Sequence, residues 1–202
     1  MSIQRINNYS DNRFSQKVLY QHGCFLADGE PYEVEIISDF KALVRGRNRA
    51  IYPDVIEQFL FFTPHITTYY DENKNVVKEY PRAELINIRL MDIQPSQFYV
   101  DEEKVKAVET FIEKGDDIII QVSRYQGKYI SLDGHTRLYY AVRKGFHEVK
   151  AVLAETDECI YDFVKEAQNR NIFTPKDLLL VSHKEYEEKW NKYCDDYFSS
   201  KN

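Results

Sequence analysis

The sequence contains few cysteines, only three in 202 residues, and none stands in a CxxC pair. Cys24, Cys159 and Cys194 are odd in number and far apart in the chain. A disulfide framework needs paired cysteines, and a structural zinc site needs closely spaced Cys or His ligands. We therefore expect reduced thiols and a cytoplasmic protein, with neither disulfides nor a zinc site.

Long apolar runs are also missing. No apolar stretch reaches the about 18 residues that a membrane-spanning helix needs. The first residues, 1–15, are polar and lack the apolar segment of a secretory signal. The sequence therefore predicts no membrane partner and no secretion.

Positive charge is not in excess. The chain has 27 Lys and Arg against 33 Asp and Glu, which gives a formal net charge of −6. Non-specific nucleic-acid binding relies on Lys and Arg meeting phosphates, so DNA is not a favoured partner. The most basic run is Arg45 to Arg49, which we interpret either as a solvated loop or as an anion site.

Several catalytic motifs are absent, among them GxSxG, the Walker A loop and HExxH. Three histidines have no Cys or acidic neighbours at the spacing of metal ligands, and we assign them no role: His22, His147 and His183. His65 stands between Pro64 and Ile66 and is interpreted as a structural residue.

Aromatic residues, by contrast, are abundant, with 16 Tyr and 12 Phe. Hydrophobic residues make up 43% of the chain, so we expect a packed core and not a disordered chain. Strand-like and helix-like segments alternate and predict the α+β class. We divide the chain into an N-terminal α+β extension of unknown role (1–80), a compact domain (82–155) and a helical C-terminal tail (156–202).

Hydrophobic periodicity predicts the elements of each region. The tail is acidic and aromatic, and we expect it to pack on the domain or on a second copy of the chain, which leaves a homo-oligomer open. The extension is predicted to contain strands at 23–27, 32–37 and 40–44, a helix at 53–62 and a hairpin of 66–70 with 76–80. The domain is predicted to contain strands at 85–90, 118–122, 129–132 and 149–154, of which the second and third form a hairpin, and helices at 101–115 and 134–144. The tail is predicted to contain helices at 158–169 and 183–198, and a short one after Pro175.

The residues with the clearest chemistry stand between the strand predicted at 129–132 and the helix that follows it. This corner is Asp133-Gly134-His135-Thr136-Arg137. A helix start presents unpaired N–H groups and partial positive charge, which suits a phosphate. Gly134 allows close approach of the backbone, and Arg137 offers a planar fork of donors. Asp133 would repel phosphate, so it suits Mg²⁺ binding or proton acceptance.

A structural interpretation of the corner stays open beside this one. Asp is a good N-cap, Gly a good turn residue, and Arg137 can pair with an acidic neighbour. Motifs of five residues also occur by chance.

The order of elements around the corner resembles that of the ParB/sulfiredoxin superfamily. The matching pieces are "IQPSQFYVDEEKVKAVETFIEKG", "IIIQVSRYQGKYISLDGHTRLYYAVRKG" and "VKAVLAE", and they cover roughly residues 85–155. The resemblance implies a small α+β domain whose motif helix starts against nucleotide phosphates. Members include CTP-binding partition proteins, ATP-dependent sulfiredoxins and free-serine kinases, and the family label carries the word "nuclease".

This sequence departs from the members' patterns at particular positions. His135 stands where sulfiredoxins have a reactive Cys, which argues against sulfinic-acid reduction. The kinases have Asp-Gly-His-His-Arg, and Thr136 replaces the second His. Their loop glutamate falls near Gln97, which cannot act as a base, and Glu102 or Glu103 is the substitute that we consider. No helix-turn-helix follows the domain.

Two main hypotheses follow for the function. In the first, ATP or another nucleoside triphosphate binds with Mg²⁺ at the corner. Gly134, His135, Thr136 and Arg137 hold phosphates, Asp133 and His135 take catalytic roles with Asp133 also binding the metal, and Gln97 and Glu102 contact a small hydroxyl substrate. The second is a non-catalytic regulatory or DNA-associated module, and a nuclease ranks third. The sequence leaves open whether the protein is an enzyme.

Overall fold

The computed structural model describes residues 1–201, which form two compact units. The first unit is Met1–Glu84, and the second begins at Leu85. Each contains helices and β-sheets, so the predicted α+β class is confirmed. The helical tail predicted from residue 156 belongs to the second unit.

The first unit is built on a six-stranded sheet in the order β1-β2-β3-β4-β5-β6. Neighbouring strands are antiparallel except β4 and β5, which run parallel because a helical crossover connects them. The strands predicted in this region all form, whereas the first strand was not predicted. The strands are β1 (Ile3–Arg5), β2 (Cys24–Ala27), β3 (Glu30–Ser38), β4 (Lys41–Gly46), β5 (Thr68–Tyr70) and β6 (Val76–Glu79).

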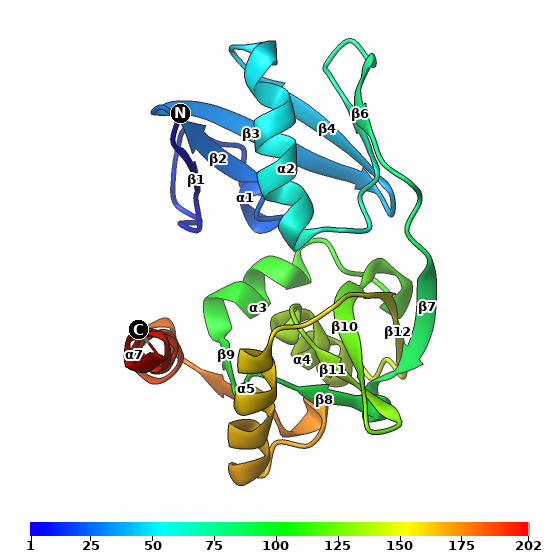
Figure 1. Ribbon diagram of the computed structural model, residues 1–202, viewed down its shortest axis with the longest axis vertical. Coiled ribbons are helices and arrows are strands. Elements are labelled where there is room, and N and C mark those ends of the chain that lie inside the picture. Colours follow the sequence, from blue (N-terminus) through cyan, green and yellow to red (C-terminus); the bar gives the residue numbers. More distant parts are fainter. Residues whose placement is uncertain (202) are drawn as a thin grey trace. The chain divides into compact units, whose positions relative to one another are not determined.

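The crossover helix, α2 (Tyr52–Phe62), lies across one face of this sheet (Figure 1). Val55, Ile56 and Phe59 lie at helical spacing and are fully buried against the strands. Each such side chain stabilises the fold by about 1.5–3 kcal/mol when removed from water. The helix ends where the Thr63 hydroxyl donates to the Phe59 carbonyl, 2.9 Å away. The helix predicted at 53–62 is confirmed.

A second, smaller core of the first unit surrounds the short helix α1 (Gln16–Tyr20). Val18 and Leu19 pack against Phe14 and Cys24. Burial raises the pKa of the Cys24 thiol to about 12, so this thiol stays protonated. All three cysteines of the chain are free in the structure.

The second unit contains a five-stranded mixed sheet in the order β7-β12-β10-β11-β8. β10 and β11 form the predicted hairpin, β12 runs parallel to β10, and β8 runs parallel to β11. The C-terminal ends of β8 and β11 therefore lie at the same end of the sheet as the N-terminal end of β10. The strands are β7 (Leu85–Arg89), β8 (Ile93–Pro95), β10 (Ile119–Tyr125), β11 (Lys128–Ser131) and β12 (Glu148–Leu153).

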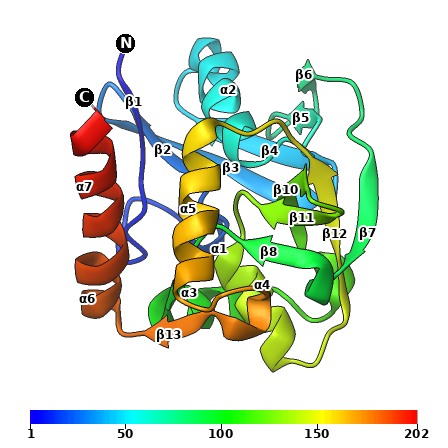
Figure 2. The same ribbon diagram turned by 60° about the horizontal axis from the view of Figure 1, so that its bottom comes forward.

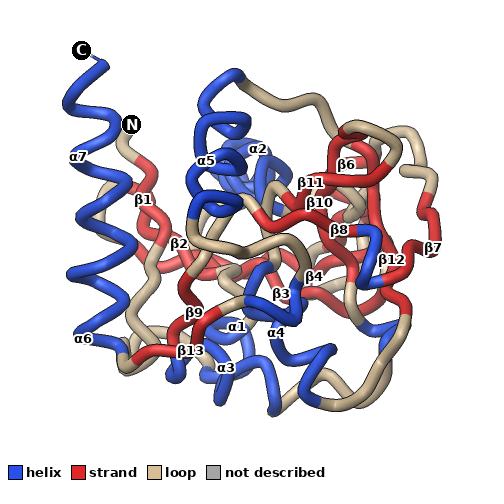
Figure 3. The backbone as a smooth tube through the Cα atoms, turned by 90° about the horizontal axis from the view of Figure 1, so that it is seen from below, coloured by secondary structure: helices blue, strands red, loops and turns tan. Residues whose placement is uncertain are grey.

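Two three-residue strands form a separate small sheet that the sequence did not predict. β9 (Tyr99–Asp101) pairs in parallel with β13 (Leu179–Val181), with Val100 opposite Leu180. Figure 3 shows the two strands beside each other, next to the start of α6. This pairing joins the tail to the segment that precedes α3.

The helix α3 (Glu102–Glu109) begins as predicted but ends early. Asp101 caps it, since its carboxylate accepts the Glu103 N–H at 2.9 Å. We predicted that the helix would continue to Gly115. Instead, the Thr110 hydroxyl donates to the Ala107 carbonyl at 2.7 Å, in competition with the helical hydrogen bonds.

The tail packs on the second unit itself, one of the two alternatives that the sequence left open. α5 (Glu158–Asn169) lies beside α7 (Lys192–Lys201), as Figure 2 shows. Phe163 of α5 contacts the rings of Trp190 and Tyr193, among others. A π-helical turn (Glu187–Asn191) separates α7 from α6 (His183–Tyr186), so the helix predicted at 183–198 is interrupted. The described residues contain no helix that is both long and apolar enough to cross a bilayer.

Candidate functional site

The predicted corner forms where β11 is followed by α4 (His135–Arg143), as the sequence indicated. Gly134 precedes the helix with a φ of +82°, in the left-handed region that favours glycine. A Cβ atom added there would lie only 2.5 Å from Cγ2 of Ile120. Only glycine therefore fits, because both the backbone conformation and the space forbid a side chain. The corner consequently holds the first turn of α4 tightly against the start of β10.

Arg137 and Asp133 form an ion pair across this corner. Nη2 of Arg137 donates to Oδ2 of Asp133 at 2.9 Å, and Nη1 donates to the Ile119 carbonyl at 2.5 Å. The Asp133 side chain is 53% exposed and that of Arg137 is 25% exposed. These two bonds hold the guanidinium in place, and its remaining N–H donors are not used by them. A phosphate placed here would meet a fixed cation and a carboxylate that can share a metal ion.

His135 lies inside the corner and is buried. The Ser96 backbone N–H can only donate, and it lies 3.3 Å from Nε2 of His135, so Nε2 is the acceptor of a neutral imidazole. The hydroxyl of Ser131 lies 3.0 Å from the same nitrogen. Burial lowers the pKa of His135 to about 4. His135 therefore joins the loop after β8 to the start of α4, and this placement suits a positioning role better than ligand contact.

The other predicted phosphate-binding residue, Thr136, lies in the first turn of α4 and is partly buried. Among the described residues we find no hydrogen bond of its hydroxyl to another side chain. α4 has no acidic residue in its first turn, and Arg143 lies in its last turn. The partial positive charge at the helix start is therefore not neutralised from within the helix.

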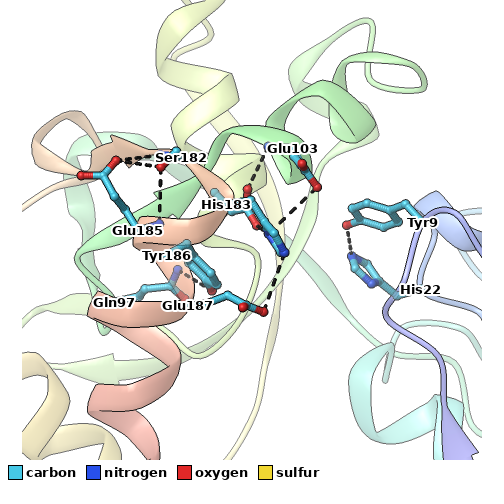
Figure 4. Close-up of polar contacts among 10 residues, drawn as sticks. Tyr9, His22, Gln97, Glu103, Ser182, His183, Glu185, Tyr186 and Glu187 are labelled. Atoms are coloured by element: carbon cyan, nitrogen blue, oxygen red, sulfur yellow. Dashed lines mark hydrogen bonds and ion pairs between the residues drawn. The ribbon is translucent and has the colours of Figure 1, made fainter.

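Gln97, the predicted substrate contact, lies next to Ser96 and therefore beside the corner. Its Nε2 donates to the Tyr99 carbonyl and also, at 3.2 Å, to the hydroxyl oxygen of Tyr186 (Figure 4). The structure thus brings a tail residue, Tyr186, to the loop that contacts the corner. Nothing in the sequence around Tyr186 indicated this contact, because it joins residues 89 positions apart.

Glu102, the other predicted substrate contact, is the first residue of α3 and is partly buried. Within residues 1–201 no hydrogen bond or ion pair links it to the corner. Its neighbour Asp101, in contrast, contacts the tail, because its Oδ2 lies 2.7 Å from Nδ1 of His183. That contact raises the pKa of His183. Our prediction that His183 has no acidic neighbour at ligand spacing was wrong, because Glu187, four residues later, lies 3.7 Å from its imidazole.

A separate hollow of about 500 Å³ lies near the start of β12 and the end of β7. Its lining residues are Arg89, Met91, Asp92, His147 and Glu148, none of which belongs to the corner. Arg89 and Asp92 already pair with each other at 2.7 Å. Among the described residues, no group of three or more His, Cys, Asp or Glu side chains is placed to hold a metal ion on its own.

The basic run of the first unit does not form a free positive patch. Arg45 lies on β4 and pairs with Glu35 at 2.6 Å and with Glu33 at 3.6 Å. The other two arginines pair as well, Arg47 with Glu30 at 3.8 Å and Arg49 with Asp71 at 3.2 Å. Each guanidinium therefore has a carboxylate neighbour, which favours the interpretation of a solvated surface over that of an anion site.

Comparison with known proteins assigns no family. No protein-family model and no curated protein matches the chain. Among solved structures, the chain is similar to the protein Atu1540 from Agrobacterium tumefaciens, with a TM-score of 0.34 and 15% sequence identity. The match covers 48% of this chain and 61% of the other, so the chain spans less than two thirds of that protein's length. A similarity this low assigns neither a fold family nor a function.

Proposed function

We propose that the corner at residues 133–137 binds the phosphates of a nucleoside triphosphate such as ATP. One observation carries the proposal: Gly134, in a conformation and a space that only glycine tolerates, fixes a helix start beside the Arg137 guanidinium. Helix N–H groups and a planar guanidinium are the groups that proteins use for phosphate chains. The bond from Arg137 to the Ile119 carbonyl holds the cation in place before any ligand arrives.

Asp133 fits a magnesium ion that is shared with the nucleotide. Mg²⁺ bound to nucleotides commonly uses one or two carboxylates and takes its other ligands from phosphates and water. A cage made of protein groups alone is therefore not required, and none occurs among the described residues. The half-exposed Asp133 carboxylate can turn to a cation without desolvation of a buried charge. When bound, the ion would neutralise phosphate charge.

The order of elements in the second unit supports membership of the ParB/sulfiredoxin superfamily. The second unit contains, in the order that the resemblance implies, a strand (β7), the loop at Ser96 and Gln97, α3, the β10–β11 hairpin, the corner, α4 and β12. In this proposal the protein works in the cytoplasm, and a small hydroxyl compound is the second substrate of a phosphotransferase. The free cysteines are consistent with that compartment.

A second candidate function is nucleotide binding without turnover, and two observations favour it. The position of the kinase glutamate is occupied by Gln97, whose amide nitrogen is engaged by Tyr99 and Tyr186. Asp133, the remaining candidate base, is paired with Arg137. Gln97 cannot accept a proton, and the Asp133 carboxylate is already engaged by the Arg137 guanidinium. The DNA-associated version is disfavoured by the paired arginines of the basic run.

The decisive experiment measures the thermal shift that Mg²⁺-ATP induces in the purified protein. We expect a shift for the wild type, its near loss in Arg137→Ala, and its retention in Arg143→Ala, which removes the same charge from the other end of α4. Each variant is first measured without ligand, because Arg137 also bonds the backbone of Ile119. No shift for the wild type, or an unchanged shift in Arg137→Ala, would refute the proposal.

Measurement of ATP turnover distinguishes the phosphotransferase from the non-catalytic module. ATP consumption in the presence of small hydroxyl metabolites, abolished in Asp133→Asn, is expected for a phosphotransferase. Binding without consumption identifies the non-catalytic module.

A further inference from the structure

The tail contributes a polar group to the surroundings of the corner. Tyr186, the last residue of α6, is only 5% exposed, and its hydroxyl oxygen lies 3.2 Å from Nε2 of Gln97. Gln97 follows Ser96, whose N–H and hydroxyl both lie 3.3 Å from Nε2 of His135. A short series of contacts thus links the tyrosine to the first residue of α4.

The direction of the hydrogen bond at Tyr186 can be assigned. Nε2 of Gln97 also contacts the Tyr99 carbonyl, which can only accept, so this atom is the amide nitrogen and a donor. The Tyr186 oxygen is therefore the acceptor in its contact with Gln97. Its own hydrogen must point elsewhere, and within residues 1–201 we find no acceptor for it. A buried donor without a partner is costly, by about 1–3 kcal/mol, and calls for an explanation.

The surroundings keep this donor protonated and place one cation beside it. Burial raises the pKa of Tyr186, and the charges of Asp101 and Asp133 act in the same direction, so the phenol keeps its proton. The Lys104 ammonium lies 4.5 Å from the centroid of the Tyr186 ring and brings a positive charge to the same place. Lys104 belongs to α3, which packs beside α4, and the two helices are joined at their C-terminal ends by the Lys144–Glu109 ion pair.

We propose that Tyr186 is a ligand-binding residue of the corner, whose hydroxyl donates a hydrogen bond to a phosphate oxygen, with Gln97 as the residue that positions it. This inference rests on the proposed function and extends it, since it makes the C-terminal segment part of the site. Such a donor recognises the phosphate chain and not the base or the sugar. The expected ligand class is therefore polyphosphate-bearing, with tripolyphosphate sharing the contact with ATP.

The test compares Tyr186→Phe with the wild type by isothermal titration with Mg²⁺-ATP, tripolyphosphate and adenosine. The substitution removes only the hydroxyl and keeps the ring on which Lys104 lies. We expect about five- to tenfold weaker binding of ATP and of tripolyphosphate, as for the loss of one hydrogen bond. Adenosine, which lacks phosphates, is expected to bind both proteins alike. Tyr193→Phe removes a hydroxyl from the next tyrosine of the tail and serves as the matched control.

The outcomes distinguish this inference from the function on which it rests. Unchanged ATP affinity in Tyr186→Phe, together with loss of binding in Arg137→Ala, would overturn the role of Tyr186 and leave the phosphate site in place. No binding of ATP or tripolyphosphate to the wild type would overturn both. Gln97→Leu provides a second variant, which keeps the tyrosine but removes its positioning donor, and it is expected to weaken ATP binding as well.

Discussion

Nδ1 of His183 lies 2.7 Å from Oδ2 of Asp101, and this contact joins the first residue of α6 to the N-cap of α3. The Asp101 carboxylate is almost fully buried, whereas the His183 side chain is 49% exposed. Glu103 and Glu187 lie farther from the imidazole, at 4.0 Å and 3.7 Å. The histidine is therefore surrounded by negative charge, which favours its protonated form.

This arrangement predicts a pH-dependent contribution of His183 to stability. The hydrogen bond to Asp101 raises the pKa of His183 above its ordinary value near 6.5. The contribution is therefore complete below about pH 6.5 and is lost as the pH rises through the raised pKa of the folded state. Because the side chain is half-exposed, we expect His183→Ala to cost at most about 1 kcal/mol, and less at pH 9 than at pH 5.5.

Urea unfolding at the two pH values measures the effect of His183→Ala. The fluorescence of Trp190, the single tryptophan of the chain, reports on the tail because its ring packs against Phe98. His147→Ala, at an exposed histidine in the loop before β12, is the control. A larger cost at pH 9 than at pH 5.5 would contradict the prediction.

For His135 we expect the opposite dependence of protein stability on pH. Burial lowers its pKa to about 4, so between about pH 6.5 and 4 the unfolded chain binds a proton that the folded chain excludes. The stability that His135 contributes is complete above pH 6.5 and falls as the pH drops toward 4, by up to about 3 kcal/mol. In His135→Gln this part of the pH dependence should disappear. If the free energy of unfolding changes equally with pH in the wild type and in His135→Gln over this interval, His135 does not cause the pH dependence.

Gly134→Ala tests the geometry of the corner. The alanine Cβ would meet Ile120 at 2.5 Å and would have to adopt a positive φ. We expect a loss of about 2–4 kcal/mol in the free energy of unfolding, from backbone strain and from displacement of the packed strand.

Gly127→Ala is the matched control for that substitution. Gly127 also has a positive φ, +77°, but an added Cβ would have nothing within 4 Å. It should cost only about 1 kcal/mol, from the backbone conformation alone. Chemical denaturation of both variants decides the matter, and equal costs would mean that close packing at Gly134 is unimportant.

The ion pairs of the basic run predict an absence of DNA binding. Arg45, Arg47 and Arg49 each have a carboxylate within 4.0 Å, and the chain is acidic overall. Fluorescence anisotropy with duplex DNA at about 100 mM salt should show no binding, and Arg47→Ala should change nothing. Salt-dependent binding that Arg47→Ala weakens would favour the DNA-associated module after all.

Local signals in the sequence were sufficient for the corner and its neighbouring elements. Asp101 before two glutamates predicted the start of α3, and the glycine at position 134 predicted the turn before α4. The β10–β11 hairpin and α5 followed from short-range periodicity and turn residues. In each case the determining interactions lie within a few residues of one another.

The elements that the sequence did not reveal depend on distant partners. β9 and β13 have three residues each, too few for periodicity, and exist because they pair with each other. α3 ends at Glu109 because the Thr110 hydroxyl competes for a helix carbonyl, although Phe111 and Ile112 continue the apolar pattern. For the same reason Tyr186 was not a candidate: its partner Gln97 is 89 positions away.

The pairing of β9 with β13 has a consequence for synthesis of the protein on the ribosome. The first unit is complete in sequence at Glu84, so its sheet can assemble while the rest of the chain is still being translated. Asp101, in contrast, contacts His183, which is synthesised 82 residues later. Gln97 contacts Tyr186, which is synthesised 89 residues later. The nascent second unit therefore exposes β9 and the surroundings of Gln97 during elongation. The side-chain contacts of Asp101 and Gln97 with the tail can form only after translation has passed Tyr186.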